Sequence, residues 1–168
     1  SVSFHDMQQI NGIGEIKAIQ LKCIAELSKR IATTRHQERI CLNHPRTIAA
    51  YCMERMRHAD LEYLWLMMFD IKCHLIDTIC LSTGSATSAF VSPKEIFETA
   101  LQFHAVQIVL LHNHPSGVPS PSAEDDIVTA RIADCGRLLG IPLIDHIIIG
   151  DQVYYSYHEN KRIIDKGE

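Results

Sequence analysis

Residues 110–126 read LLHNHPSGVPSPSAEDD, an apolar run that ends in two histidines and is followed by a proline-rich loop and a group of acids. Alternate residues of a β-strand face the same side, so His112 and His114 at the end of a strand can direct both imidazoles to one point. The loop returns the chain to Ser122, where a helix is expected to begin, and Asp125 lies in its first turn. Two imidazoles and one carboxylate are the usual three protein ligands of a catalytic zinc ion, whose fourth position is left to water.

The same residues also have an explanation without chemistry. A serine followed three residues later by an aspartate, as in Ser122 and Asp125, is a favourable helix N-terminus by itself. A histidine beside a strand end is usually a polar residue with satisfied hydrogen bonds. The spacing alone therefore leaves open both a metal site and an ordinary succession of strand, loop and helix.

The segments around this stretch predict an α/β domain. Strands are expected from the apolar runs 61–70, 73–82, 105–114, 141–150 and 151–159, and helices over about 46–57, 92–103 and 122–140. Ser92, Pro93 and Glu95 predict a capping box with proline at the first helical position, and Gly140 is expected to end the last helix. The order of these elements predicts a mixed central β-sheet flanked by helices, with an antiparallel hairpin formed by the first two strands.

At fixed spacing, the motif His112-x-His114, seven residues, Ser122, two residues and Asp125 resembles the metal motif of the JAMM (MPN+) metallopeptidases. Over residues 61–158 the chain more narrowly resembles the bacterial RadC family, in HNHPSGVPSPSAEDD, in SPKEIFETAL before it and in DHIIIG after it. The resemblance implies the JAMM/MPN fold, which has the layering of cytidine deaminases. It also implies one zinc ion per chain, held by the two histidines and the aspartate.

The JAMM pattern further includes a glutamate at the start of the first strand, and Glu62 precedes the apolar run here. Without the resemblance, Glu62 would be interpreted as a charged residue at the mouth of a strand. With it, Glu62 is the expected general base and Ser122 the expected hydrogen-bond donor to the oxyanion. The resemblance therefore implies metal-assisted hydrolysis of a peptide or isopeptide bond. The substrate is expected to be a protein or peptide that the sequence does not identify.

Two further features concern the surroundings of the metal. A metal-bound histidine generally gives its second ring N–H to a carboxylate or carbonyl, and we expect Asp145 or the carbonyls around Asn113 to accept it. His146 is expected to be structural, and Val118 in the loop is given no role. Residues 83–88, TGSATS, are either an ordinary loop or part of a groove for an extended peptide.

At the N-terminal end, INGIGEIKAIQL resembles a helix-hairpin-helix motif, in which a Gly-x-Gly turn and the following helix start offer backbone N–H groups to DNA phosphate. Gly12 and Gly14 permit the turn, and Lys17 and Lys22 are expected to add phosphate contacts. The alternative is a helical packing element without DNA. Residues 1–40 are thus predicted to be a helix-hairpin-helix-like segment, truncated at its N-terminus, and residues 45–168 a RadC/JAMM-like metallohydrolase domain.

Charge and composition limit the remaining possibilities. The whole chain holds 16 Lys/Arg and 20 Asp/Glu. The first 40 residues hold six Lys/Arg and four Asp/Glu, a net charge of +2. The remaining residues therefore hold ten Lys/Arg and 16 Asp/Glu, a net charge of −6. Weak DNA contact is therefore expected only at the N-terminal segment. The chain has no apolar run of the roughly 18 residues that a membrane span requires, and it does not open with a signal peptide. Its six cysteines form no C-x-x-C pair and predict reduced, buried thiols in a cytoplasmic protein.

Two other functions are considered. One is a DNA-associated binding module in which the metal site is structural or vestigial. The other is a metal-dependent nuclease, suggested by the letters HNH at residues 112–114, but HNH nucleases spread these residues over a ββα unit, whereas here they are consecutive. The DNA-repair association of the RadC family follows from no residue of this chain. The effect of Glu62→Gln on hydrolysis separates the first interpretation from the others.

Overall fold

The computed structural model describes residues 4–10, 12–35, 41–84 and 92–163. Backbone contacts divide the chain into two units, residues 1–39 and residues 40–168. The first unit contains a short helix α1 (Phe4–Gln8) and a long helix α2 (Glu15–Arg35). None of the helices in the described ranges is both long enough and apolar enough to span a membrane.

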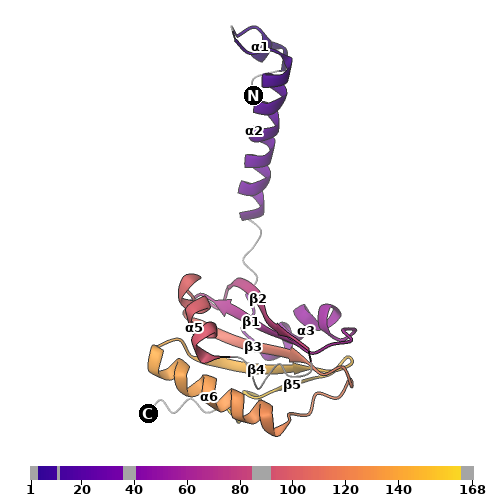
Figure 1. The fold of residues 1–168 in the computed structure, drawn as a ribbon, viewed down its shortest axis with the longest axis vertical. Helices are drawn as coiled ribbons and strands as arrows, with labels where there is room; N and C mark the ends of the chain where they lie inside the picture. Colours follow the sequence, from indigo (N-terminus) through magenta and orange to yellow (C-terminus); the bar gives the residue numbers. More distant parts are fainter. Residues whose placement is uncertain (1–3, 11, 36–40, 85–91, 164–168) are drawn as a thin grey trace. The chain divides into compact units, whose positions relative to one another are not determined.

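The second unit is built on a five-stranded sheet (Figure 1). Its strands are β1 (Tyr63–Phe69), β2 (Leu75–Thr83), β3 (Gln107–Asn113), β4 (Leu143–Ile149) and β5 (Tyr154–Ser156), and their order across the sheet is β2-β1-β3-β4-β5. Only β3 and β4 are parallel; the other neighbours are antiparallel. The mixed sheet, the β1–β2 hairpin and the pairing of β4 with β5 confirm the predicted fold class.

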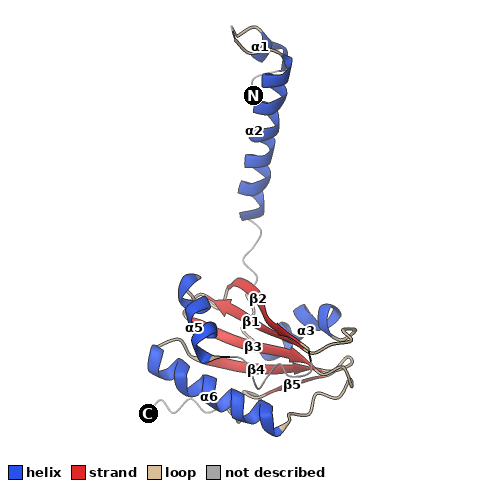
Figure 2. Cartoon of the chain, viewed as in Figure 1, coloured by secondary structure: helices blue, strands red, loops and turns tan. Residues whose placement is uncertain are grey.

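In the described part of this unit, helices cover both faces of the sheet (Figure 2). They are α3 (Pro45–Met56), α5 (Pro93–Gln102) and α6 (Ala123–Leu139). The core on the side of α5 and α6 contains Leu64, Leu66 and Met68 of β1, Ile108 and Leu110 of β3, and Ile96 and Ile132 of the helices. The core on the side of α3 contains Met67 and Phe69 of β1, Val109 and Leu111 of β3, and Ile48 and Cys52 of α3.

This alternation positions the candidate ligands. Ile108 and Leu110 of β3 face α5 and α6, so the period of two places His112 on the same side, directly above the start of α6. Ser122 caps α6, and Gly140 ends it in the left-handed conformation, with a φ of 69°. Both ends of α6 agree with the sequence. At α5, by contrast, the predicted capping box requires the Ser92 hydroxyl to accept the N–H of Glu95. It accepts the N–H of Lys94 instead, one residue earlier.

The cysteines differ in part from the prediction. All six are free thiols, as expected, but Cys23, Cys41 and Cys80 are exposed, and only Cys52 is buried. On α2 the apolar neighbours of Cys23, Leu21 and Ile24, are exposed as well, so apolar neighbours in the sequence did not indicate burial. Burial raises the pKa of Cys52 to about 11, so this thiol is inert at neutral pH.

Candidate metal centre

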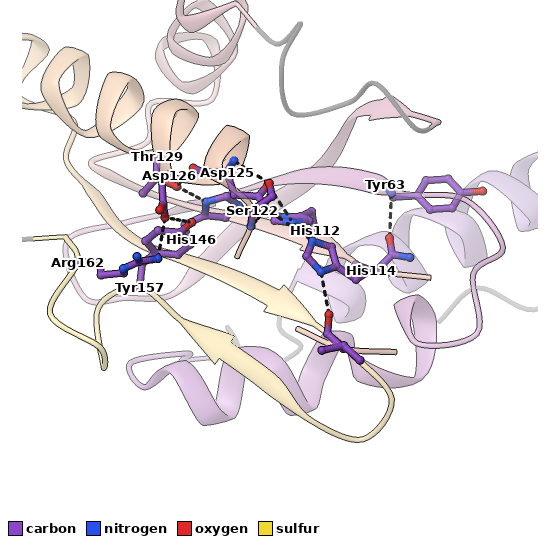
Figure 3. Close-up of polar contacts among 12 residues, drawn as sticks. Tyr63, His112, His114, Ser122, Asp125, Asp126, Thr129, His146, Tyr157 and Arg162 are labelled. Carbon is purple, nitrogen blue, oxygen red and sulfur yellow. Dashed lines mark hydrogen bonds and ion pairs between the residues drawn. The ribbon is translucent and has the colours of Figure 1, made fainter. Parts of the chain in front are cut away.

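The donor atoms of His112, His114 and Asp125 meet where the end of β3 lies beside the start of α6 (Figure 3). The Nε2 atoms of the two histidines are 3.0 Å apart. Oδ1 of Asp125 lies 3.3 Å from Nε2 of His112, and Oδ2 lies 3.6 Å from Nε2 of His114. His112 and Asp125 are buried, whereas His114 is partly open to solvent. The structure thus brings the three side chains together, with one of them accessible.

These separations fit a metal ion. Ligand atoms about 2.1 Å from a tetrahedral zinc ion lie about 3.4 Å from one another. The two histidine nitrogens are 3.0 Å apart, and each of them lies 3.3 Å or 3.6 Å from one of the two oxygens of the Asp125 carboxylate. Imidazole nitrogen and carboxylate oxygen are also the ligands that divalent transition-metal ions prefer. The separations and the types of donor atom therefore both fit a divalent metal ion.

The proton on the His114 ring supports the same conclusion. Its Nδ1 atom lies 2.8 Å from the carbonyl oxygen of Val118. A carbonyl only accepts, so Nδ1 carries the proton and Nε2 of the neutral ring presents a lone pair. That lone pair faces a second ring nitrogen and a carboxylate, and three such electron-rich groups repel one another unless positive charge lies between them. A cation between the three groups removes this repulsion. In metal sites, too, a ligating histidine often donates its second ring N–H to a backbone carbonyl, as His114 does here.

The pKa values of His114 and Asp125 show the same attraction for positive charge. The pKa of His114 is raised, chiefly because Nε2–H of the protonated ring would donate to Asp125 and to a smaller extent because of the charge of Glu62. Burial by itself would raise the pKa of Asp125, but the two histidines and a serine hydroxyl lower it far below its usual range, so the carboxylate is ionised. Burial lowers the pKa of His112 to about 4, so this ring is neutral at pH 7. A deprotonated carboxylate and a neutral imidazole are the forms in which these groups bind metal.

Ser122 and Asp125 form a capping box at the start of α6. The serine hydroxyl accepts the Asp125 N–H at 3.1 Å and donates to Oδ2 of Asp125 at 2.6 Å, while the same Oδ2 accepts the Ser122 N–H at 2.8 Å. The helix cap and the candidate metal ligand, which the spacing left as alternatives, are thus the same carboxylate. The cap holds this carboxylate in the orientation that faces the histidines.

Glu62 stands at the mouth of β1, one residue before the strand begins, and is partly buried. Its carbonyl accepts the N–H of Gly84 at 2.8 Å. Leu64 pairs with His112, so the antiparallel register continues to place Glu62 opposite His114. Because the charge of Glu62 contributes to the raised pKa of His114, its carboxylate lies within electrostatic reach of the site.

The chain that carries this site is similar to known proteins. The family model of the RadC-like JAB domain matches residues 42–162. This chain belongs to that family. A UPF0758 protein of Clostridium acetobutylicum is 38% identical over 159 residues, which cover 95% of this chain and 69% of the relative. A UPF0758 protein of Alkaliphilus metalliredigens is 42% identical over 154 residues, which cover 92% of this chain and 66% of the relative. The chain spans about two thirds of the length of these relatives, and their names state no activity.

Within the RadC-like JAB domain, the residue that supports His112 is His146, which is expected from the sequence to be structural. Nδ1 of His112 lies 2.8 Å from Nε2 of His146, which is fully buried. Asp145, the expected partner, instead accepts the hydroxyl of Ser156 at 2.6 Å and the N–H groups of His146 and His158. The expectation for Asp145 is therefore wrong. The backbone carbonyl of Val118, whose side chain has no assigned role, holds His114.

An irregularity of β4 explains why Asp145 is not the partner. Ile108 pairs with Leu143, but Val109 pairs with Asp145, so Ile144 is an extra residue on β4. Strict alternation from Leu143, which faces α5 and α6, would place Asp145 on the side of the metal site. The extra residue reverses the alternation, and His146 faces that side instead.

Asn113 is a second residue of the domain that the sequence analysis did not assign. Its side chain is buried; Oδ1 accepts the N–H of Tyr63 at 2.9 Å, and Nδ2 donates to the carbonyl of Leu61 at 3.0 Å. The amide therefore binds the backbone on both sides of Glu62 and ties it to the strand that carries the histidines.

We expect Asn113→Ala to destabilise the domain by about 1–3 kcal/mol, because two hydrogen bonds of a buried amide are lost and its partners, the N–H of Tyr63 and the carbonyl of Leu61, lose their acceptor and donor. Chemical denaturation of the metal-free protein measures this loss. Asn160→Ala removes an amide that makes one contact, to the carbonyl of Ser156, and is the matched control with a smaller effect. Equal stability of the two variants would contradict the role given to Asn113.

The predicted DNA-binding residues lie in the N-terminal unit, outside the range of the family match. Gly12, with a φ of 87°, and Gly14 lie in the turn between α1 and α2, and Lys17 and Lys22 are exposed on α2. Nζ of Lys17 donates to the carbonyl of Gly12 at 3.0 Å and so closes the turn on itself. The structure describes a short and a long helix here, and DNA contact stays a prediction. Of the predicted peptide groove at residues 83–88, positions 85–88 lie outside the described residues.

Proposed function

We propose that this chain is a metal-dependent hydrolase of the JAMM type, that the metal is zinc, and that it cleaves a peptide or isopeptide bond in a protein or peptide substrate. The observation that carries the proposal is the meeting of the donor atoms of His112, His114 and Asp125 beside the strand mouth that bears Glu62. When bound, zinc supplies a polarising positive charge and lowers the pKa of water towards 7. The remaining steps belong to the side chains of the protein.

Glu62 takes the proton of the attacking water and passes it to the leaving amine. This side chain is only partly buried, so it remains open to water, which this role requires. Its attachment to β1 through the neighbouring backbone keeps it at a fixed place relative to His114. His114, the accessible ligand, marks the side from which the substrate approaches.

Ser122 donates its hydroxyl to the oxygen that becomes negative during hydrolysis. In the structure this hydroxyl donates to Oδ2 of Asp125, and one hydroxyl donates one hydrogen bond. The proton must therefore turn from Asp125 towards the substrate for the reaction. Ser122 is exposed, so the space for this rotation is open.

Two variants separate the catalytic role of Ser122 from its role as a helix cap. We expect Ser122→Ala and Ser122→Gly both to lower kcat by about 10²–10³-fold, because both lack the donor. Alanine also costs about 1 kcal/mol of stability as an N-cap, whereas glycine costs only a few tenths. Kinetics and denaturation of both variants measure the two effects. A Ser122→Gly enzyme with unchanged kcat would show that the hydroxyl serves only the helix.

The test of the function uses the whole chain in two stages. Elemental analysis of purified protein, after titration with Zn²⁺, is expected to give one zinc per chain. Cells in which the wild-type protein is replaced by the Glu62→Gln variant are then expected to accumulate amide-linked species that purified zinc-loaded wild type cleaves in vitro. Absence of zinc binding, or accumulated species that the wild type leaves intact, would overturn the proposal.

A further inference from the structure

We propose that Thr129 and His146 are positioning residues, which fix His112 in the tautomer that leaves its Nε2 atom free. The inference rests on the proposed function only in so far as this Nε2 atom binds the metal. Three short contacts carry it. Oγ1 of Thr129 lies 2.6 Å from the carbonyl oxygen of Asp125 and 2.5 Å from Nδ1 of His146, and Nε2 of His146 lies 2.8 Å from Nδ1 of His112.

The protons in this chain can be counted. Thr129 brings one hydroxyl proton, and each neutral imidazole brings one N–H, so three protons are available for three contacts. The carbonyl of Asp125 only accepts, so the contact at 2.6 Å needs the hydroxyl proton. Oγ1 then accepts from Nδ1–H of His146, and Nε2 of His146 accepts from Nδ1–H of His112. This assignment places one proton in every contact and leaves a lone pair on Nε2 of His112.

The opposite assignment of the protons leaves one of these contacts without a proton. If Thr129 donated to His146, the N–H of His146 would point at His112, and Nε2 of His112 would carry its proton towards His114 and Asp125. Two oxygen atoms 2.6 Å apart, Oγ1 of Thr129 and the carbonyl oxygen of Asp125, would then have no proton between them. Such a contact between buried acceptors is strongly unfavourable. The hydroxyl of Thr129 thus decides the tautomer of two rings.

The surroundings hold these groups in place. Thr129, His146 and His112 are each at most 4% exposed, so water does not compete for their hydrogen bonds, and burial disfavours a charged imidazolium. Tyr157 stacks on His146, with ring centroids 5.1 Å apart and an angle of 12° between the planes, and its hydroxyl donates to Asp126 (Figure 3). The helix that carries one metal ligand therefore also orients another.

The test compares Thr129→Val, which has nearly the same shape and no hydroxyl, with Thr129→Ser, which keeps the hydroxyl. Loss of a group that orients a metal-bound histidine typically weakens metal binding by about 10–100-fold. We expect this loss in the valine variant and affinity close to wild type in the serine variant, measured by competition for Zn²⁺ with a chromophoric chelator. Thr129→Ala removes the same hydroxyl with less bulk and is used if the valine variant does not fold.

A second measurement reports the tautomer directly. Long-range ¹H–¹⁵N spectra of the metal-free protein at about pH 8, where an ordinary histidine is neutral, distinguish the protonated from the free ring nitrogen. We expect Nδ1–H and free Nε2 for His112 in the wild type and the serine variant, and protonation of Nε2 to appear in the valine variant. A purely structural role would lower stability without moving this proton.

An unchanged tautomer together with unchanged Zn²⁺ affinity in Thr129→Val would overturn the inference. Neither measurement uses hydrolysis, so the outcome of each is independent of the proposed reaction. If the tautomer and the affinity behave as expected but no substrate is found, the proposed function fails and the inference stands. If hydrolysis is found and the valine variant binds metal like wild type, the inference fails alone.

Discussion

Glu62→Gln is expected to reduce hydrolysis by about 10²–10⁴-fold, the usual contribution of a general base, while one metal ion per chain stays bound. The amide of glutamine has nearly the shape of the carboxylate but does not accept the proton of water. The metal is expected to remain, because its protein ligands are the side chains of His112, His114 and Asp125. Turnover of an identified substrate and elemental analysis of the same preparation measure both quantities.

Glu124→Gln is the matched control, since it removes the same charge from an exposed position in the first turn of α6. It is expected to keep wild-type turnover. Full activity of Glu62→Gln would show that the proposed mechanism is wrong, even with zinc in the site. Loss of metal from Glu62→Gln would show that Glu62 acts as a ligand rather than a base.

Asp125→Asn is expected to weaken Zn²⁺ binding by more than the roughly 10–100-fold typical of a group that only orients a ligand, because it removes the one anion from the ligand set. Binding to the folded state stabilises it by about 2.7 kcal/mol when the free metal is 100 times Kd. Zn²⁺ should therefore raise the melting temperature of the wild type strongly and that of the variant little. Thermal melts with and without Zn²⁺ check this.

Asp126→Asn provides the control on the neighbouring residue. Its carboxylate accepts from the hydroxyl of Tyr157 and pairs with Arg162, both at 2.8 Å, and it is not among the three ligands. The variant is expected to lose some stability in both conditions but to keep the shift that Zn²⁺ produces. If Asp125→Asn retained the full shift, the ligand set derived from the geometry would be wrong.

The sequence by itself was sufficient for the local features of this site. A strand period of two determines that His112 and His114 face one side. Which side that is came from the structure, because the residues before them on β3 are apolar and buried on both faces of the sheet. The start of α6 is equally local, because Ser122 and Asp125 satisfy the free N–H groups of a helix end wherever the helix lies. Glu62 required the resemblance, since nothing in its own neighbourhood distinguishes it from an ordinary charged residue at a strand mouth.

Only the tertiary structure decided which groups support the ligands. His146 lies 34 residues from His112 in the sequence, and it reaches this ring because β3 and β4 are parallel neighbours and Ile144 bulges out of register. A bulge reverses every following side chain of a strand, so a shift of one residue exchanged Asp145 for His146. The amino-acid pattern determines which side chains a strand offers, but the register between strands, a property of the whole sheet, determines which of them meet.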